Sequence, residues 1–387
     1  MSSIQASIAA SEFVEDLSSD AATRGSLTIV RPTYPDSAPS FLEIMSLTLV
    51  GSLLFAGTIL LFSRYGLAVE SFGDSSAYES VASAIQRWTF NGLQIKQFWG
   101  YPYAVAAVAI VARVSIQTSL LLVSWISCFV TTALAYRLWG GWIAGSFAIL
   151  NFAWMQRSFL GGSEPLAVAL IFGAFLAVRQ KHYLSAALLA ALSTIVRPLG
   201  IFCLVGIGID LLCRRQYKKL ALSVLIGAIV GTLSVLPLIA HFGSAFATVR
   251  SYQDGGTALF GYPLYAIIKG TILYPAPLTN LLLSFGWIVL VLAGLLRMIK
   301  NSDFHSYAKE HPVEILFALP YTLFVFCYNY PVFARSNFPR FIIPALPIVF
   351  VALATWLPLK RRVIWALGVV MPTLAALSAL GIRHLIR

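Results

Sequence analysis

The chain has 387 residues, of which 59% are hydrophobic and only 11% are charged, whereas soluble proteins average about 45–50% and about 25%. Its formal net charge is +12, but Lys and Arg form short clusters between apolar runs, which argues against nucleic-acid binding and is typical of membrane proteins. The apolar runs are too long for barrel strands, and backbone in lipid must satisfy its own hydrogen bonds, so an all-α polytopic membrane protein is predicted.

The first 40 residues are rich in Ser and Ala and carry both acidic and basic side chains. A signal peptide would place a basic stretch directly before its apolar region, and this segment does not. Residues 1–40 are therefore expected to form a flexible cytoplasmic tail, and residues 41–387 a polytopic transmembrane domain.

The apolar runs predict about 11 transmembrane helices, within a range of about 9–12. They cover 41–63, 117–136, 141–158, 164–179, 183–196, 199–213, 219–241, 279–298, 313–330, 341–359 and 363–382. Short, tilted or re-entrant helices are expected in 183–213, because two membrane crossings must fit into this short segment. Lys and Arg collect on one side of this alternation, which predicts a cytoplasmic N-terminus and an outward connection 64–103.

That outward connection contains the acidic stretch "ESFGDSSAYESVA", residues 70–82. Ser76 and Glu79 match a capping box, and Tyr78 begins an apolar face that predicts a helix lying in the outer membrane interface. Glu79 thus has a structural explanation. Asp74 precedes the cap and is either an alternative N-cap or turn residue, or a functional carboxylate.

Other outward charges border apolar runs. Glu164 opens a predicted span and suits the helix dipole, but a charge so near hydrocarbon is costly and favours a functional hypothesis. Arg197, Arg335 and Arg340 each have the alternative of a snorkelling anchor. Together with Asp74 they suit an anionic, lipid-tethered substrate, because Arg binds phosphate through paired N–H groups and Asp accepts a proton from a hydroxyl.

Two aromatic Gly-Tyr-Pro stretches contain Tyr101 and Tyr262, which are typical of an interfacial aromatic belt or candidates to line a sugar site.

The four cysteines lie within or at the ends of apolar runs without paired spacing, so neither a disulfide framework nor a metal site is expected. No matching pair of broken helices is evident, which disfavours the repeat architecture of secondary transporters.

Five short motifs occur in order along the chain. They are "GDSSAY" at 73–78, "WGYP" at 99–102, "SEPL" at 163–166, "AALLAALSTIVRPLG" at 186–200 and "RFIIP" at 340–344. Together they resemble the GT-C superfamily of integral-membrane glycosyltransferases, whose members use polyprenyl-phosphate-linked sugars, and above all its bacterial protein-mannosyltransferase and aminoarabinose-transferase branches. The chain differs from some branches in its single loop aspartate and in the lack of a large soluble C-terminal domain, which makes a bound divalent metal doubtful.

The resemblance implies transfer of a single hexose or mannose-like sugar from a polyprenyl-phosphate carrier to a glycan, lipid or protein hydroxyl at the outer face of the cell membrane. We expect inversion at the anomeric carbon and no cofactor. Asp74 is expected to be the general base, Arg197, Arg335 and Arg340 to hold the phosphate, and Glu164 to orient a sugar hydroxyl. A transporter or flippase of lipid-linked saccharide, and a polysaccharide polymerase or ligase, remain alternatives.

Overall fold

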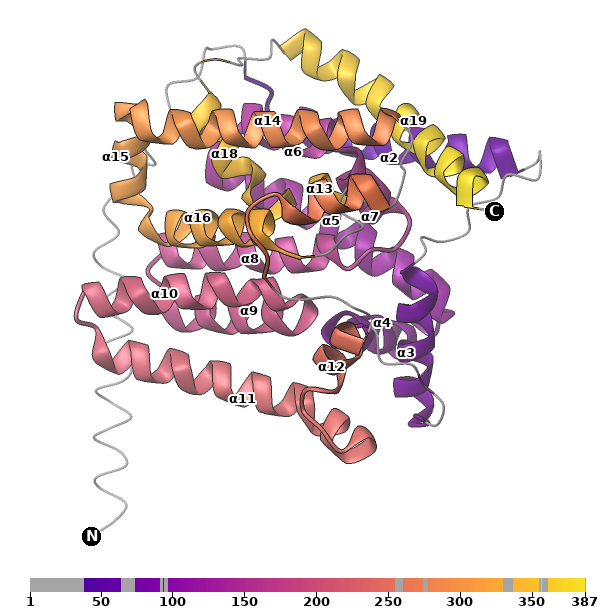
Figure 1. Ribbon diagram of the computed structural model, residues 1–387, viewed down its shortest axis with the longest axis vertical. Helices are drawn as coiled ribbons and strands as arrows, with labels where there is room; N and C mark the ends of the chain where they lie inside the picture. The colour runs from indigo at the N-terminus through magenta and orange to yellow at the C-terminus, as the bar shows by residue number, and fades with distance from the viewer. Residues whose placement is uncertain are drawn as a thin grey trace. The chain divides into compact units, whose positions relative to one another are not determined.

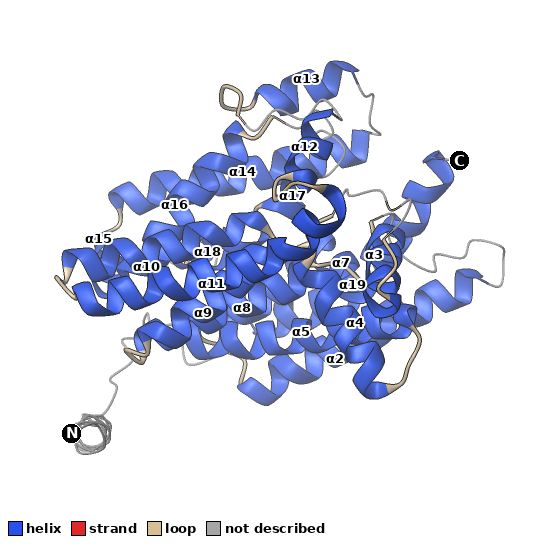
Figure 2. Ribbon diagram, turned by 90° about the horizontal axis from the view of Figure 1, so that it is seen from below, coloured by secondary structure: helices blue, strands red, loops and turns tan. Residues whose placement is uncertain are grey.

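The computed structural model describes residues 38–63, 74–90, 93, 97–254, 260–273, 278–329, 337–354, 356 and 361–386. They all belong to one compact unit, which spans 34–387. Every regular element in these ranges is a helix (Figure 2). The expected tail lies outside the described residues, apart from residues 38–40.

The first half of the chain forms the helices α2 (Phe41–Ser63), α3 (Ser75–Arg87), α4 (Gly100–Ala112), α5 (Ile116–Trp139), α6 (Gly141–Leu150), α7 (Phe152–Phe159), α8 (Glu164–Arg179) and α9 (Tyr183–Val196). The second half forms η1 (Pro198–Gly200), α10 (Ile201–Cys213), α11 (Tyr217–Phe242), α12 (Ala247–Asp254), α13 (Tyr265–Leu273), α14 (Leu278–Lys300), α15 (Ser302–Glu310), α16 (Pro312–Cys327), α17 (Asn337–Phe341), η3 (Ile343–Ala345), α18 (Leu346–Leu353) and α19 (Arg361–Ile386).

Five of these helices, α2, α5, α11, α14 and α19, are long and apolar enough to cross a membrane. Two bent pairs, α7–α8 and α15–α16, raise the number to seven if each pair is one span. A multi-pass helical membrane protein is therefore confirmed, but the predicted number of about 11 spans is not. The predicted span 141–158 is divided at Asn151, and those at 183–196, 199–213 and 341–359 form shorter helices.

Helices α8, α9, α10 and α16 run side by side through the interior, with α5 also against α8 and with α11 packed along α9 (Figure 1). Small side chains permit the close approach of α8 and α9, because α9 buries Ala186, Ala187, Ala190 and Ala191. On another face of α8, Phe172 meets the ring of Trp139 edge-on at 4.8 Å. The core around the candidate site is thus built from tightly packed apolar helices.

The predicted interfacial helix is α3, and it packs on α4. Tyr78, Val81 and Ala82 are buried on its apolar face, as the sequence periodicity predicts. The predicted capping box is wrong, because the N-cap position is occupied by Asp74 and Ser76 already lies inside the helix. The helix therefore begins two residues earlier than expected.

A buried polar network joins the C-terminal ends of α5 and α8 to the start of α16. Arg179 Nε lies 2.7 Å from Glu314 Oε1, and Arg179 Nη1 donates to Leu138 O at 2.7 Å. Trp139 Nε1 and the Tyr307 hydroxyl both donate to Glu314 Oε2. Both carboxylate oxygens of Glu314 are thus paired, so this network rigidifies one end of the bundle. The candidate site lies at the opposite end of α8.

Candidate active site

A sharp turn between α7 and α8 brings acidic and basic side chains together. The two helices are bent by 106°. Gly161 has φ +85, a left-handed conformation that favours glycine. A Cβ atom at Gly162 would lie 2.8 Å from both Arg157 Cβ and Glu164 Oε2. The two glycines therefore let the end of α7 press against the first residue of α8.

Hydroxyl groups from two other helices hold this turn. Ser75 Oγ donates to Leu160 O at 3.0 Å, and Ser124 Oγ donates to Gly162 O at 2.9 Å. A bend leaves carbonyl groups without a partner from their own helix, so these side chains supply the missing donors. The first of these bonds also fixes the start of α3 against the turn.

Arg197 reaches the site from the end of α9. This helix ends at Val196 because the next residue, Arg197, precedes Pro198, and a residue before proline avoids the α-helical region. Arg197 is extended, with φ −145 and ψ 124. Its Nη1 atom lies 2.7 Å from Glu164 Oε1 and 3.2 Å from Ser163 Oγ.

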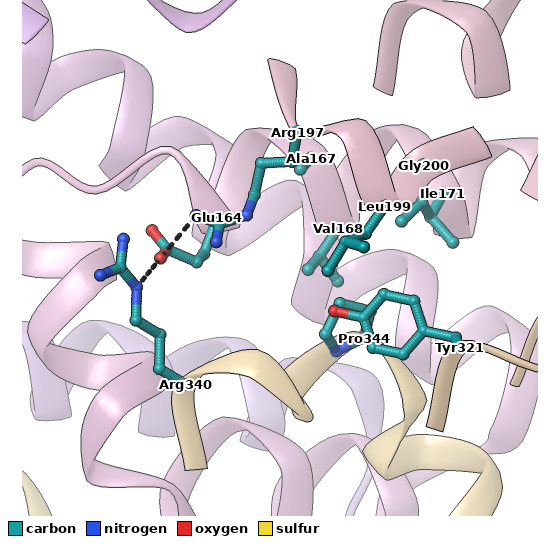
Figure 3. Close-up of a pocket in the computed structure, with 10 residues that line it drawn as sticks. All are labelled: Glu164, Ala167, Val168, Ile171, Arg197, Leu199, Gly200, Tyr321, Arg340 and Pro344. Carbon is teal, nitrogen blue, oxygen red and sulfur yellow. Dashed lines mark hydrogen bonds and ion pairs between the residues drawn. The ribbon is translucent and has the colours of Figure 1, made fainter. Parts of the chain in front are cut away.

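Arg340 connects the two acids of the site. Its Nη2 atom lies 2.7 Å from Asp74 Oδ2, and its Nε atom donates to Glu164 Oε1, which lies between Arg340 and Arg197 (Figure 3). Arg157 Nη1 lies 3.3 Å from the same Asp74 oxygen, and Arg157 Nε lies 4.0 Å from Glu164 Oε1. We call these five side chains the charged cluster. Its three guanidinium groups outnumber its two carboxylates, so it has a surplus positive charge.

Asp74 differs from the other acid of the cluster in its surroundings. Its side chain is 35% exposed, whereas that of Glu164 is 4% exposed. Asp74 occupies the N-cap position of α3 but makes no side-chain capping bond, so capping does not account for its carboxylate. Burial raises the pKa of Asp74, but the guanidinium groups of Arg340 and Arg157 outweigh it and hold that pKa below its usual value. Asp74 is therefore ionised at neutral pH.

A narrow pocket opens beside the charged cluster. Its charged end is formed by Glu164, Arg197 and Arg340, and its apolar walls by Ala167, Val168, Ile171, Leu199 and Pro344 (Figure 3). The Tyr321 ring also lines it, and its hydroxyl donates to Phe341 O at 2.6 Å. The pocket thus places charged side chains at one end and apolar side chains beyond them.

The structure brings together four of the predicted site residues, Asp74, Glu164, Arg197 and Arg340. Arg335 lies outside the described residues, so its phosphate-binding role stays a prediction. Arg157 is a member of the charged cluster that the sequence motifs do not indicate. The available signal was a cation inside the apolar run predicted as a span, since such charges are rare there and are paired or functional.

The two predicted tyrosines lie elsewhere. Tyr101 is fully buried, and its hydroxyl bonds to Leu120 O at 3.0 Å and Ser124 Oγ at 2.7 Å. It lies one layer behind the cluster, with its ring edge-on to Tyr78 at 4.9 Å. Tyr262 is 61% exposed and packs against Tyr265. The sugar-lining roles of Tyr101 and Tyr262 stay predictions.

Within the described ranges, no group of three or more His, Cys, Asp or Glu side chains is placed to hold a metal ion. The acids of the charged cluster instead have guanidinium partners. The charge on these carboxylates is thus balanced by side chains of the protein itself.

Substitution of Gly162 by Ala tests how tightly the turn is packed. We expect a loss of about 1–3 kcal/mol in the free energy of unfolding, because the new methyl group must displace Arg157 or Glu164. The matched control is Gly57→Ala, where a Cβ atom meets nothing within 4 Å. Denaturant unfolding of the purified protein measures both, and equal stability of the two variants would contradict the described packing.

Comparisons with known proteins give one finding. No family model and no curated protein matches the chain. The chain is similar to a crystal structure of ArnT from Cupriavidus metallidurans bound to undecaprenyl phosphate, with a TM-score of 0.49 and 12% identity. The match covers 83% of this chain and 62% of that one. The chain thus spans less than two thirds of that protein, and a similarity of this size establishes no activity.

Proposed function

We propose that the protein is an integral-membrane glycosyltransferase that moves one hexose or mannose-like sugar from a polyprenyl-phosphate carrier to an acceptor hydroxyl. The observation that carries this proposal is the charged cluster at the mouth of an apolar pocket. The surplus positive charge suits a phosphate, the apolar walls suit a lipid chain, and the partly exposed carboxylate suits a proton acceptor. The polyprenyl class of the donor comes from the sequence resemblance.

In the proposed reaction, the acceptor oxygen attacks the anomeric carbon on the face opposite the phosphate. The bond between that carbon and the phosphate oxygen breaks, and its electron pair leaves with the polyprenyl phosphate. The hydroxyl proton passes to the carboxylate of Asp74. Because the phosphate departs as an anion, it needs cations rather than a general acid, and Arg340 and Arg197 supply them. The anomeric configuration is inverted.

Glu164 has two proposed roles. Its Oε1 atom accepts from both Arg197 and Arg340, which keeps their guanidinium groups at the mouth of the pocket. Its Oε2 atom is buried and has no hydrogen-bond partner in the described part of the chain. Buried acceptors are normally paired. Glu164 also lines the pocket, where we propose that its carboxylate orients a hydroxyl of the bound sugar.

The proposed topology puts the charged cluster on the outer side of the membrane. It rests on the distribution of Lys and Arg, which collects at the other ends of the predicted spans. The proposal counts the shorter helices among the 11 spans, including α9 and α10, and leaves the N-terminus in the cytoplasm. The network around Arg179 then faces the cytoplasm.

A transporter or flippase of lipid-linked saccharide is the second candidate, because one observation favours it. The structure contains two bent helix pairs, α7–α8 at 106° and α15–α16 at 110°, although sequence analysis found no matching pair. Broken helices hold substrates in many transporters. In the second pair, however, Glu314 near the break accepts from Arg179 through its Oε1 atom and from Trp139 Nε1 through its Oε2 atom. This arrangement leaves the charged cluster as the favoured ligand site.

Substitution of Arg340 by Gln tests the phosphate site. We expect the affinity for undecaprenyl phosphate, measured with the full-length protein in nanodiscs, to fall by about 10–100-fold. A hydrogen bond to a charged group contributes about 1.5–3 kcal/mol, which corresponds to such a factor. The control is Arg250→Gln, because Arg250 is an exposed cation on α12. The affinity of this variant for undecaprenyl phosphate should match that of the wild type.

The same full-length protein, in nanodiscs for sugar transfer and in vesicles for lipid movement, decides between the two candidate functions. Labelled undecaprenyl-phosphate hexoses are supplied with an envelope extract as the source of acceptor. Release of undecaprenyl phosphate together with labelled acceptor supports the transferase. Movement of the intact labelled lipid between vesicle leaflets without sugar transfer would instead support the transporter, and equal affinity of Arg340→Gln and wild type would refute the phosphate site.

A further inference from the structure

Two guanidinium groups from different helices contact the same oxygen of Asp74. Arg340 Nη2 lies 2.7 Å from Asp74 Oδ2 and Arg157 Nη1 lies 3.3 Å from it. Arg340 also lines the pocket, whereas Arg157 is not among the residues that line it. A ligand in the pocket therefore reaches Arg340 and not Arg157.

Arg157 is held firmly in its place. Its side chain is 5% exposed, and its backbone carbonyl accepts from the Gly162 amide at 2.7 Å. The space beside it is filled, because a Cβ atom at Gly162 would lie 2.8 Å from Arg157 Cβ. Both the main chain and the side chain of Arg157 are thus fixed by the turn between α7 and α8.

The donor phosphate and Asp74 compete for Arg340. In the structure, one N–H group of Arg340 donates to Asp74. An anion that enters the pocket competes for the N–H groups of Arg340, including this one. The loss of this partner makes the carboxylate a stronger base, because a nearby cation favours the ionised form. It also removes the shorter of the two contacts that fix the carboxylate.

We propose that Arg157 is a positioning residue, which holds the Asp74 carboxylate in place while Arg340 passes to the donor phosphate. This inference rests on the proposed function. Because Arg340 leaves Asp74 only when the donor phosphate binds, the base becomes fully available only after the donor has bound. An acceptor is therefore activated only when a sugar is ready for transfer.

Among the described residues, four titratable groups face Asp74 from the elements packed around it. They are Arg340 on α17, Arg157 on α7, Glu164 on α8 and Tyr78 on α3. With Arg157 replaced by Gln, the cation that remains beside Asp74 is shared with the phosphate. The pKa of Asp74 then rises, so a larger fraction is protonated at a given pH. The acid limb of the pH–rate profile must move to higher pH.

The experiment compares Arg157→Gln with the wild type in nanodiscs, using the undecaprenyl-phosphate hexose that the wild type consumes. For Arg157→Gln we expect kcat to fall and the acid limb to move upward by about 1–3 pH units, the range produced by one neighbouring cation. Its affinity for undecaprenyl phosphate should fall less than that of Arg340→Gln. Arg157→Lys keeps the charge and should return the acid limb most of the way to its wild-type pH. Arg87→Gln, at the exposed end of α3, is the control and should leave the profile unchanged.

Three outcomes would overturn the inference while leaving the proposed function intact. The first is a lower rate of Arg157→Gln with an unchanged acid limb, which indicates a purely structural role. The second is a loss of affinity equal to that of Arg340→Gln, which makes Arg157 a phosphate ligand. The third is an additional loss of rate when Arg157→Gln is combined with Asp74→Asn, because a residue that acts through Asp74 has no effect without it. A wild type that neither binds undecaprenyl phosphate nor transfers sugar refutes the proposed function itself.

Discussion

Substitution of Asp74 by Asn is expected to lower the rate of sugar transfer by about 10²–10⁴-fold, the range that general base catalysis contributes. The carboxamide keeps the size of the side chain but accepts no proton at neutral pH. The fold should tolerate the change, because Asp74 is 35% exposed and makes no capping bond to α3. The effect is therefore expected in kcat rather than in the amount of folded protein.

The same variant should bind undecaprenyl phosphate more tightly than the wild type. Arg340 then has a neutral neighbour in place of the Asp74 carboxylate, so the phosphate no longer competes with an anion for it. Titration of the nanodisc preparation measures the affinity. Glu79→Gln, on the same helix, is the control and should leave rate and affinity unchanged. A full transfer rate in Asp74→Asn would refute the proposed base.

Substitution of Glu164 by Gln is expected to lower the free energy of unfolding by about 3–5 kcal/mol, the effect of removing one partner of a buried ion pair. The side chain of Glu164 is 4% exposed, and its Oε1 atom accepts from both Arg197 and Arg340. Without its charge, these two guanidinium groups face each other in a buried setting. Sugar transfer should also be lost, because the two cations proposed to hold the phosphate lose their common anchor.

A surface ion pair offers the matched control for Glu164. Glu43 pairs with Arg361, whose side chain is 55% exposed, and exposed pairs contribute about 0–1 kcal/mol. Glu43→Gln should therefore unfold at nearly the same denaturant concentration as the wild type. Both variants are measured by denaturant unfolding in the same detergent. A Glu164→Gln protein as stable as Glu43→Gln would contradict the description of the charged cluster.

Local signals explain which parts of the fold could be predicted. The bounds of α8 and α9 follow from the sequence, because Pro165 favours a helix start and Pro198 ends the preceding helix before Arg197. The apolar face of α3 follows from its periodicity in the same way. Four predicted site residues meet because each lies beside such a boundary, where a charged side chain leaves the apolar part of its helix.

Contacts between distant segments explain what could not be predicted. Arg157 and Asp74 are 83 positions apart, and the apolar run around Arg157 gives no sign of its partner. Tyr101 belongs to a motif that suggests an exposed aromatic side chain, yet α4 packs this ring into the interior. Hydropathy measures composition and does not record where an apolar run breaks into shorter helices, so the break at Asn151 inside the run 141–158 could not be predicted.

The hydroxyl bonds at the turn between α7 and α8 affect how the site comes apart. If α3 detaches from the bundle, the carbonyl of Leu160 loses the donor that Ser75 supplies, in a place with little water. The same movement separates Asp74 from Arg340 and Arg157. Opening of the interfacial helix and dissolution of the cluster therefore form one cooperative event. Partially opened molecules then lack both contacts of Asp74 with the guanidinium groups, so under the proposed mechanism they are expected to be inactive.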